Sequence, residues 1–390
     1  MQNFVFDNPT RIIFGKGTIS RIGNEVKRCG KNVLLVYGQG SIKKHGIYDQ
    51  VLASLSEARL SVTEFSGVKA NPLFSYALKG IELAKKENID VILAVGGGSV
   101  IDTAKTIAAG VKAEPGDDIW DFFTFKKKIR AALPILTVVT VSASASEMNP
   151  TAVITREEGA QKFSITSSLI QPRVSVLDPT VLFSLKAACS AYGAVDIIAH
   201  LLEPYFNNTE PESPLQNRFV EGIMKTVMES IEAILKDPKN YDARANMMWS
   251  ATLAFNGVTS AGMGLISFPA HMIEHSLSAM YDVAHGAGLS VVLPAWMNYA
   301  VGKRPAKFAR LGREIFDISE KDDVKAAVEG INRLKKWFAS IGSPVSLKDI
   351  RIGEGESDKI AENAAALAKL WALKDYNKDV ISGILHLCKA

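Results

Sequence analysis

The sequence has little cysteine and no long apolar run. Its three cysteines, Cys29, Cys189 and Cys388, are far apart and form no C-x-x-C pair. A disulfide framework is therefore excluded, and a reducing, cytoplasmic compartment is expected. The longest apolar runs are of strand length or interrupted, and the N-terminus lacks the apolar core of a signal peptide, so no membrane span is expected.

The chain also has little excess of either sign of charge. The 390 residues carry 45 basic and 41 acidic side chains, a formal net charge of +4. No basic stripe with interleaved aromatic residues occurs, so a nucleic-acid partner is not expected. The H-E-x-x-H motif of zincin proteases is absent as well. Hydrophobic residues make up 47% of the chain, which is enough for sizeable cores, and the length suits two domains.

The first half of the chain alternates between apolar strands and amphipathic helices. Strands that are apolar on both faces and alternate with helices predict a parallel sheet with helices on both sides. We expect strands at 32–38, 61–68, 90–99 and 133–141, and helices at 47–60, 74–89 and 100–111.

The second half is predicted to be helical, because strand-like runs nearly vanish beyond Lys186. We expect helices at 186–206, 213–236, 240–260, 268–281, 305–316, 322–341 and 357–374. The composition shifts near Leu177-Asp178-Pro179. The predicted architecture is an α/β nucleotide-type domain at 1–180 and an all-helical domain at 181–390, with a small-molecule site in a cleft between them.

A glycine-rich turn, AVGGGSVIDTAK (94–105), joins a predicted buried strand to a predicted helix. Without side chains, its glycines let the backbone approach a phosphate, and the free amides at the helix start point at the anion. The turn differs from the G-x-G-x-x-G fingerprint and lacks the G-K-[ST] end of a P-loop. A pyrophosphate site and a tight strand–helix turn without a ligand both fit it.

A second turn, YGQGSIKKHG (37–46), follows the first predicted strand and offers Gln39, Ser41, Lys43 and Lys44 but no carboxylate. Such groups suit a ribose 2′-phosphate, which favours NADP over NAD. However, Asp117 and Asp118 lie about 20 residues after the glycines, where the common fingerprint places the acid that binds a ribose hydroxyl. If they have that role, the preference reverses.

Five residues are candidates for a metal site. Asp196 and His200 are four apart on a predicted helix, so they share a face and supply half of a site, although a surface Asp–His hydrogen bond also fits. His271 and His275 have the same spacing. His285 lies fourteen residues beyond His271, roughly 21 Å along a continuous helix, so these two share an ion only if the chain turns back. The glycines of YDVAHGAG permit such a turn. Either His271 and His275 or His271 and His285 complete the site, or the three histidines are unrelated.

Together these motifs resemble the iron-containing (group III) alcohol dehydrogenases, and more closely their butanol dehydrogenase branch, along nearly the whole chain. The resemblance rests on FVFDNPTRIIFGKGTI (4–19), GGGSVIDTAK (96–105), SASASEMN (142–149), VLDP (176–179), GAVDIIAHLLEPYF (193–206) and EHSLSAMYDVAHGAG (274–288). It implies an architecture like that of dehydroquinate synthase. It also implies one divalent metal, iron or zinc, on Asp196, His200, His271 and His285, with His275 near the nicotinamide and substrate as a candidate proton relay.

The resemblance also implies a set of cofactor-binding residues. These are Gly38, Gln39, Ser41, Gly96, Gly97, Gly98, Ser99, Asp102, Thr140, Ser144, Lys162 and Leu182. Glycine at position 38 fits NADP, since family members that use NAD carry an acid there. Ala145 and Ser142 stand where the family pattern has a glycine and a proline.

The implied reaction is reversible hydride transfer between NAD(P) and a primary alcohol or aldehyde. Met148, Met263, Leu265 and Phe268 indicate an apolar pocket for an aliphatic substrate. Two short apolar runs that flank DNPTR predict an N-terminal hairpin-like edge through which two copies form a homodimer. A lyase of dehydroquinate synthase type is the main alternative, but the two metal helices lack the lysines and arginines that a polyanionic substrate needs. A cofactor-free metal hydrolase and a non-catalytic binding protein are further alternatives.

Overall fold

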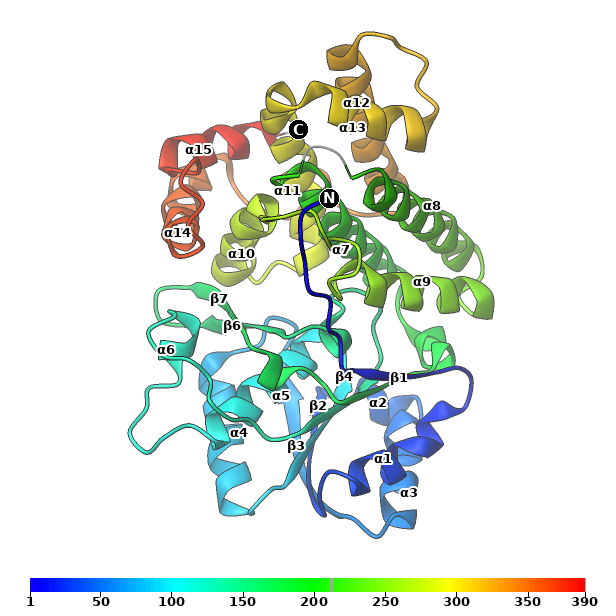
Figure 1. Cartoon of the computed structure of the whole chain (residues 1–390), viewed down its shortest axis with the longest axis vertical. Coiled ribbons are helices and arrows are strands. Elements are labelled where there is room, and N and C mark those ends of the chain that lie inside the picture. The colour runs from blue at the N-terminus through cyan, green and yellow to red at the C-terminus, as the bar shows by residue number, and fades with distance from the viewer. Residues whose placement is uncertain (211–212, 390) are drawn as a thin grey trace. The chain divides into compact units, whose positions relative to one another are not determined.

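The computed structural model describes residues 1–210 and 213–389 (Figure 1). The chain divides into two compact units. The sheet unit comprises Asp7–Lys186 and Asp237–Thr252, and the helical unit comprises Met1–Phe6, Ala187–Lys236 and Leu253–Ala390. The first six residues thus belong with the helices and residues 237–252 with the sheet, whereas the predicted boundary is a single one at 180.

The sheet unit contains six parallel strands in the order β1-β8-β5-β4-β2-β3. They are β1 (Arg11–Phe14), β2 (Asn32–Gly38), β3 (Ser61–Val68), β4 (Val91–Gly96), β5 (Ile135–Val139) and β8 (Val174–Leu177). Every residue of β4, β5 and β8 is buried, as expected of strands covered on both faces. The prediction of a parallel α/β unit followed by helices is confirmed.

Short helices and one hairpin complete the sheet unit. The helices are α1 (Ile22–Lys27), α2 (Ser41–Lys44), α3 (Ile47–Glu57), α4 (Phe74–Lys86), α5 (Gly98–Val111), α6 (Trp120–Phe123) and, as far as Thr252, α9 (Tyr241–Ala254), with 3-10 turns η1 (Thr18–Arg21), η2 (Ser146–Met148), η3 (Ser168–Ile170) and η4 (Pro179–Ser184). The hairpin pairs β6 (Thr151–Arg156) with β7 (Gln161–Thr166) in antiparallel register.

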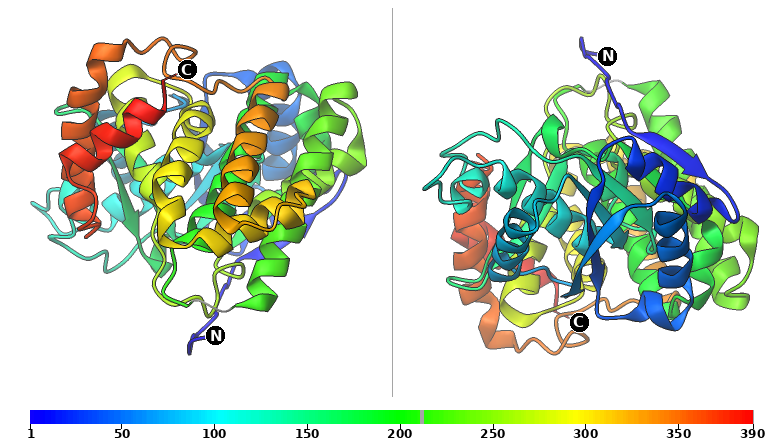
Figure 2. Two further views of the ribbon diagram at one scale, coloured as in Figure 1. Left: turned by 90° about the horizontal axis from the view of Figure 1, so that it is seen from above. Right: turned by 90° about the horizontal axis from the view of Figure 1, so that it is seen from below.

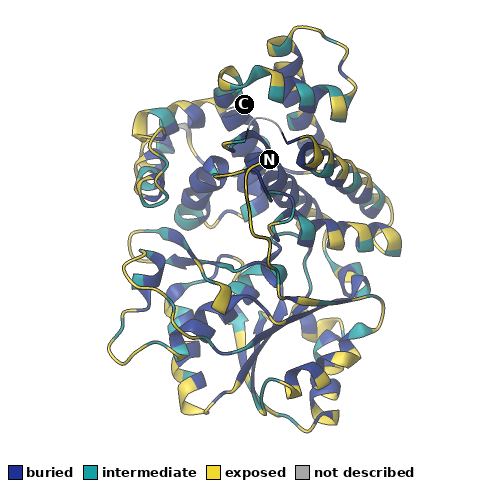
Figure 3. Ribbon diagram, in the orientation of Figure 1, coloured by how far each residue is buried: buried dark blue, intermediate teal, exposed yellow. Residues whose placement is uncertain are grey.

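The helical unit is built around helices that are apolar on nearly all sides. Its members are α7 (Ala187–Phe206), α8 (Pro214–Lys236), α10 (Pro269–Tyr281), α11 (His285–Ala300), α12 (Pro305–Phe316), α13 (Asp323–Ser340), α14 (Ser357–Leu370) and α15 (Lys378–Leu387), with η5 (Val301–Lys303) and η6 (Glu354–Glu356). Helices α7, α10 and α11 are buried along most of their length (Figure 3), which is typical of central helices.

Helices α12 and α13 lie side by side (Figure 2) and meet through two glycines. A Cβ atom on Gly330 would lie 2.9 Å from the Cα atom of Gly312, so the two glycines let the helix backbones approach. Among the described residues, every helix is too short or too polar to span a lipid bilayer.

The structure corrects the predicted N-terminal hairpin. Of the two apolar runs, only RIIF forms a strand, and this β1 pairs in parallel with β8 rather than with residues 4–6. The Arg11 amide donates to the Arg173 carbonyl, so the strand is fixed by the sheet. The prediction also missed β6, β7, β8, α11 and several short helices. The start of α11 has a turn-like sequence, HGAG, which concealed the helix.

Candidate metal centre and cofactor-binding turns

Helix α7 presents Asp196 and His200 on one face, one turn apart. Both are buried, and the Asp196 Oδ1 atom lies 3.3 Å from the His200 Nδ1 atom. The surface Asp–His reading is therefore wrong for this pair. Phe255 stacks on the His200 ring at 4.5 Å between ring centroids, which shields the pair from water.

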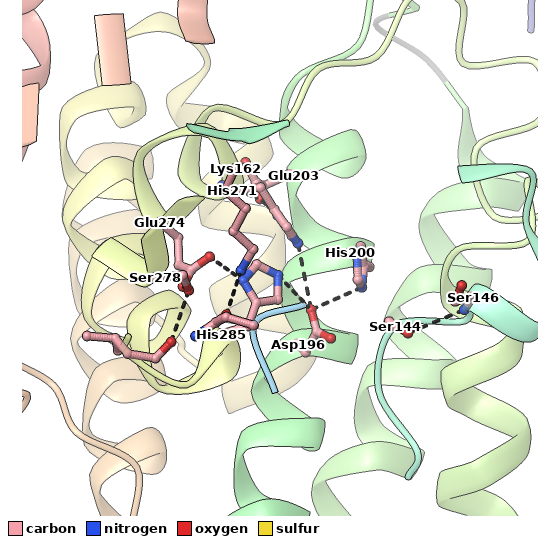
Figure 4. A network of polar contacts seen from close by, with 12 residues as sticks. Ser144, Ser146, Lys162, Asp196, His200, Glu203, His271, Glu274, Ser278 and His285 are labelled. Atoms are coloured by element: carbon pink, nitrogen blue, oxygen red, sulfur yellow. Dashed lines mark hydrogen bonds and ion pairs between the residues drawn. The ribbon is translucent and has the colours of Figure 1, made fainter. Parts of the chain in front are cut away.

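Helices α10 and α11 bring two more histidines to the same carboxylate. Helix α10 ends at Tyr281, Asp282 adopts a left-handed conformation with φ of 53°, and α11 begins at His285. This is the reversal that a shared ion requires. The Nε2 atoms of His271 and His285 each lie 3.7 Å from Asp196 Oδ1, and Figure 4 shows all three imidazoles gathered around Asp196.

Gly286 makes this approach possible. A Cβ atom at position 286 would lie 2.1 Å from the Tyr192 carbonyl oxygen of α7, so any side chain there would push the start of α11 away. The glycine beside His285 is thus explained by helix–helix contact, which brings the His285 ring within reach of Asp196.

The cluster contains three buried polar atoms with no hydrogen-bond partner. They are Asp196 Oδ1, His200 Nδ1 and His271 Nε2. Buried polar atoms are almost always paired, because an unpaired one costs roughly 1–3 kcal/mol. An oxygen and imidazole nitrogens converging on one point are the donors that Zn²⁺ or Fe²⁺ prefers. The residues present therefore fit a divalent cation.

Two fully buried glutamates, which the sequence analysis did not assign, orient the histidines. Glu203 accepts a hydrogen bond from the His271 Nδ1 atom and also from the Ala270 amide at 2.6 Å, so it fixes both the ring and the start of α10. Glu274 accepts from His285 Nδ1 and from Ser278 Oγ. With Nδ1 bonded to a carboxylate, Nε2 carries the lone pair that a metal needs.

The positions of the glutamates on the helices could have revealed them. Glu203 lies three residues after His200, and Glu274 three residues after His271, each on an otherwise apolar helix. An acid on the ligand face of a buried helix is a signal for such an orienting role.

Electrostatics favour one positive charge at the centre of the cluster. Burial lowers the pKa of His200 to about 3, so this ring is neutral. Burial also disfavours a charged His271, but Glu203 and Asp196 on its two sides outweigh burial and raise the His271 pKa to about 10. Burial raises the pKa of Asp196, and the surrounding histidines, first His200, more than offset this, so the pKa is lowered. A proton or a metal ion satisfies this demand.

His275 lies beside the cluster rather than in it. It is buried on α10, its ring centroid is 5.7 Å from that of His285, and Trp371 packs edge-on against it at 5.4 Å. Glu274, His275 and His285 also form a compact group of possible ligands. In that group, however, Glu274 is already bonded to His285 and Ser278, so the carboxylate is not left without partners.

The residues predicted to line an apolar pocket differ in their contacts and in how far they are buried. Phe268 packs edge-on against His271 at 5.6 Å. Met263 is fully buried, and Leu265 is 81% exposed. Phe268, together with Phe255, therefore supplies an apolar wall beside the histidines.

The glycine-rich turn connects β4 to α5 in the sheet unit, as predicted. A Cβ on Gly96 would lie 2.5 Å from Val100 Cγ2, one on Gly97 3.0 Å from Val141 Cγ2, and one on Gly98 2.3 Å from Ser144 Oγ. Gly96 is thus needed for packing of the turn, and Gly97 and Gly98 keep it free of crowding by Val141 and Ser144. The first turn of α5 carries no acidic side chain, which leaves its amide end suited to an anion. The Ser99 hydroxyl donates to the Ala70 carbonyl.

Asp102 serves as a clamp within the sheet unit. Its carboxylate accepts from Ser146 Oγ at 2.6 Å and from the Val153 amide at 3.0 Å. Lys105, one turn later on α5, is completely buried and donates to the Asn149 and Thr151 carbonyls at 2.8 and 2.7 Å. The hydrogen bonds of Asp102 and Lys105 tie the segment 142–153 to α5. Asp102 therefore has a structural role, and its place near the cofactor stays a prediction.

Other predicted cofactor residues lie in the same unit. The Thr140 amide donates to the Gly96 carbonyl, which joins the end of β5 to the glycine turn. Lys162 is buried and donates to Asn71 Oδ1 at 3.2 Å, and Leu182 is buried in η4. The sequence analysis did not identify Asn71 as the partner of Lys162.

The second turn begins where β2 ends. Gly38 and Gly40 flank Gln39, Gly40 has φ of 109°, and Ser41 starts α2. Asp117 and Asp118, which would favour NAD if they bound the ribose, form contacts within their own segment. Asp117 forms an ion pair with Lys127, and Asp118 Oδ1 accepts from the Trp120 amide at 2.9 Å, so they stabilise the segment around α6.

Comparison with known proteins identifies the family. Residues 9–179 match the family described as iron-containing alcohol dehydrogenase, and residues 190–388 match the C-terminal family of the Fe-containing alcohol dehydrogenases. The chain belongs to the iron-containing alcohol dehydrogenase family. The lyase alternative is not favoured, and the family resemblance inferred from the motifs is confirmed.

Relatives of this alcohol dehydrogenase cover the whole chain. It is 41% identical to the probable NADH-dependent butanol dehydrogenase 1 of Bacillus subtilis (strain 168), over 99% of either chain. It is 37% identical to an NADPH-dependent aldehyde reductase of Escherichia coli (strain K12), over 90% of this chain and 89% of the relative. The crystal structure of NADH-dependent butanol dehydrogenase A from Thermotoga maritima has a TM-score of 0.96 and 44% identity, over 100% and 99% of the two chains. The protein is thus an oxidoreductase of the alcohol dehydrogenase type with a metal and a nicotinamide cofactor.

Proposed function

We propose that the protein interconverts small to medium aliphatic alcohols and aldehydes, with NAD(P) and one Fe²⁺ or Zn²⁺ ion. The observation that carries this proposal is the cluster of three buried atoms on Asp196, His200 and His271 that have no hydrogen-bond partner and could bind a metal. Buried glutamates fix the rings of His271 and His285 in the same cluster. The names of the relatives, butanol dehydrogenases and an aldehyde reductase, support the substrate class. The apolar wall of Phe255 and Phe268 supports aliphatic over charged substrates.

We assign the ion to Asp196, His200, His271 and His285. When bound, the cation supplies Lewis-acid polarisation of the substrate oxygen and the nicotinamide supplies the hydride chemistry. Glu203 and Glu274 hold the rings of His271 and His285 in the tautomer that leaves Nε2 free. His275 is assigned to proton transfer between the substrate hydroxyl and solvent, which its position beside His285 supports.

We assign the cofactor to the turns of the sheet unit, with Gly96, Gly97, Gly98 and Ser99 at the pyrophosphate. Gly38 ends β2, the strand next to the glycine-turn strand, and Gln39 and Ser41 follow it; the absence of an acid in this turn favours NADP. Relatives of both preferences exist, since the Bacillus subtilis protein is named NADH-dependent and the Escherichia coli protein NADPH-dependent.

We also propose a homodimer in a reducing, cytoplasmic setting. Phe4, Val5 and Phe6 are 51%, 94% and 47% exposed, an apolar segment that a second copy would cover. The cysteines are free, in accord with a reducing compartment.

The test is absorbance at 340 nm with purified protein, butanal and either NADPH or NADH, before and after chelation. We expect loss of absorbance that stops when the metal is removed and returns when Fe²⁺ or Zn²⁺ is added. Protein that holds both metal and cofactor yet oxidises neither nucleotide with any aldehyde would refute the proposal.

A further inference from the structure

Four side chains of the sheet unit form a cluster next to the turn that follows β2. Tyr37 on β2 and Tyr48 on α3 donate their hydroxyls to the two oxygens of Glu64 on β3, at 2.5 and 2.6 Å. The Lys43 ammonium group lies 3.5 Å from Glu64 Oε2 and 4.3 Å from the centre of the Tyr48 ring. The two phenol hydroxyls, first that of Tyr37, lower the pKa of Glu64, so its carboxylate is charged at neutral pH.

The turn beside this cluster is where a ribose 2′ group is read. In doubly wound dinucleotide-binding sheets, the 2′-reading group follows the strand next to the glycine-turn strand, at the carboxyl edge. Two strands flank β4, namely β5 and β2. On the β5 side, Val141 and Ser144 pack within 3.0 Å of where side chains on Gly97 and Gly98 would begin. On the β2 side there is room, since the nearest atom to a Cβ on Gly38 is 3.6 Å away.

Within this turn, Lys43 forms an ion pair with the carboxylate of Glu64. Glu64 is in register with Leu35, three residues before Gly38, which is about 10 Å along the strand. The Glu64 carboxylate and the rings of Tyr37 and Tyr48 hold the ammonium group beside the edge strand β3. An ammonium group that is paired with Glu64 is less available to a phosphate at the turn.

We propose that Glu64 is a specificity-determining residue that lowers the preference for NADPH by competing with the ribose 2′-phosphate for Lys43. Tyr37 and Tyr48 are positioning residues that fix both oxygens of Glu64. This inference rests on the proposed nucleotide site and concerns the ratio between the two cofactors. Because Lys43 and Glu64 are 48% and 40% exposed, their attraction is screened, and we expect an effect of about fivefold.

The experiment measures binding of 5′-AMP and of adenosine 2′,5′-bisphosphate to the full-length protein by calorimetry, which needs neither metal nor turnover. The variants are Glu64→Gln, Lys43→Met and the double variant. Glu87→Gln is the matched control, since it removes the negative charge from the exposed ion pair between Lys86 and Glu87 at the end of α4 in the same unit. The ratio of kcat/KM for NADPH to that for NADH is measured in parallel.

We expect Glu64→Gln to tighten the bisphosphate about fivefold and to leave 5′-AMP unchanged, with the same rise in the NADPH to NADH ratio. Lys43→Met and Glu87→Gln leave the ratio as in the wild type, and the double variant loses the gain. An unchanged ratio in Glu64→Gln, or a gain that persists in the double variant, overturns the role of Glu64. Failure of wild-type protein to bind either nucleotide would instead overturn the proposed cofactor site.

Discussion

Glu274 should set how tightly the metal site proposed in the helical unit binds its ion. The carboxylate is fully buried and accepts from His285 Nδ1, so it fixes the direction of the His285 ring toward Asp196. Removal of such an orienting partner weakens metal binding about 10- to 100-fold, which corresponds to about 1.4–2.7 kcal/mol. Glu274→Gln keeps an acceptor oxygen and loses the charge, so we expect about 10-fold. Glu274→Leu loses both, so we expect about 100-fold.

Gly288 offers an independent way to disturb the same contact. A Cβ atom at position 288 would lie 2.7 Å from both Glu274 Cγ and Oε1, closer than atoms tolerate, so Gly288→Ala displaces the carboxylate without changing any charge. Gly222→Ala is the matched control, because a Cβ on Gly222 of α8 has no atom within 4 Å. We expect Gly288→Ala to weaken metal binding and Gly222→Ala to leave it unchanged.

The assay is competition for Zn²⁺ between the metal-free protein and a chromophoric chelator, with circular dichroism to verify that each variant is folded. Metal affinity within threefold of the wild type in both Glu274→Leu and Gly288→Ala, with the fold intact, would refute the orienting role of Glu274. It would also indicate that His285 does not contribute to the metal site.

Three further predictions concern other residues. His275→Ala should keep its full metal content while turnover falls about 100-fold, and loss of metal instead would make His275 a ligand. Burial lowers the pKa of Lys105 to about 8, so between pH 8 and its ordinary 10.5 the unfolded state binds more protons, and the unfolding free energy should rise with pH relative to Lys105→Met in urea titrations. Gly38→Asp, for which there is space, should lower the kcat/KM ratio of NADPH to NADH, because a carboxylate accepts from the ribose hydroxyl and repels a phosphate.

The sequence predicted the sheet better than the elements that complete it. Apolar runs such as VILAVG on β4 are unambiguous because both faces of the strand are covered. Helix α11 was missed because HGAGLSVVLPAW begins with glycines and contains Pro294, both of which usually mark loops. Here tertiary contact overrides local preference, since Gly286 is needed against the Tyr192 backbone.

The same limit applies to the histidines. Spacing alone left two pairs open, His271 with His275, which share a helix face, and His271 with His285, which needs a turn of the chain. Which partner reaches Asp196 depends on the reversal at Asp282, and a left-handed residue that is not glycine leaves little trace in the sequence. The structure places His285 Nε2 at 3.7 Å from Asp196 Oδ1, which favours His271 and His285 as the pair.

The glycine turn and the metal cluster differ in how much they say about function. A side chain on Gly96 would collide with Val100, and one on Gly97 or Gly98 would crowd Val141 or Ser144, so packing favours glycines in this turn with or without a phosphate. In contrast, packing gives no reason to bury Asp196, His200 and His271 with partnerless atoms facing one another, since each such atom costs free energy. A divalent cation bound by these atoms as ligands turns that cost into a gain. The helical unit therefore carries the stronger structural argument for catalysis, although the glycine motif is the more conspicuous one in the sequence.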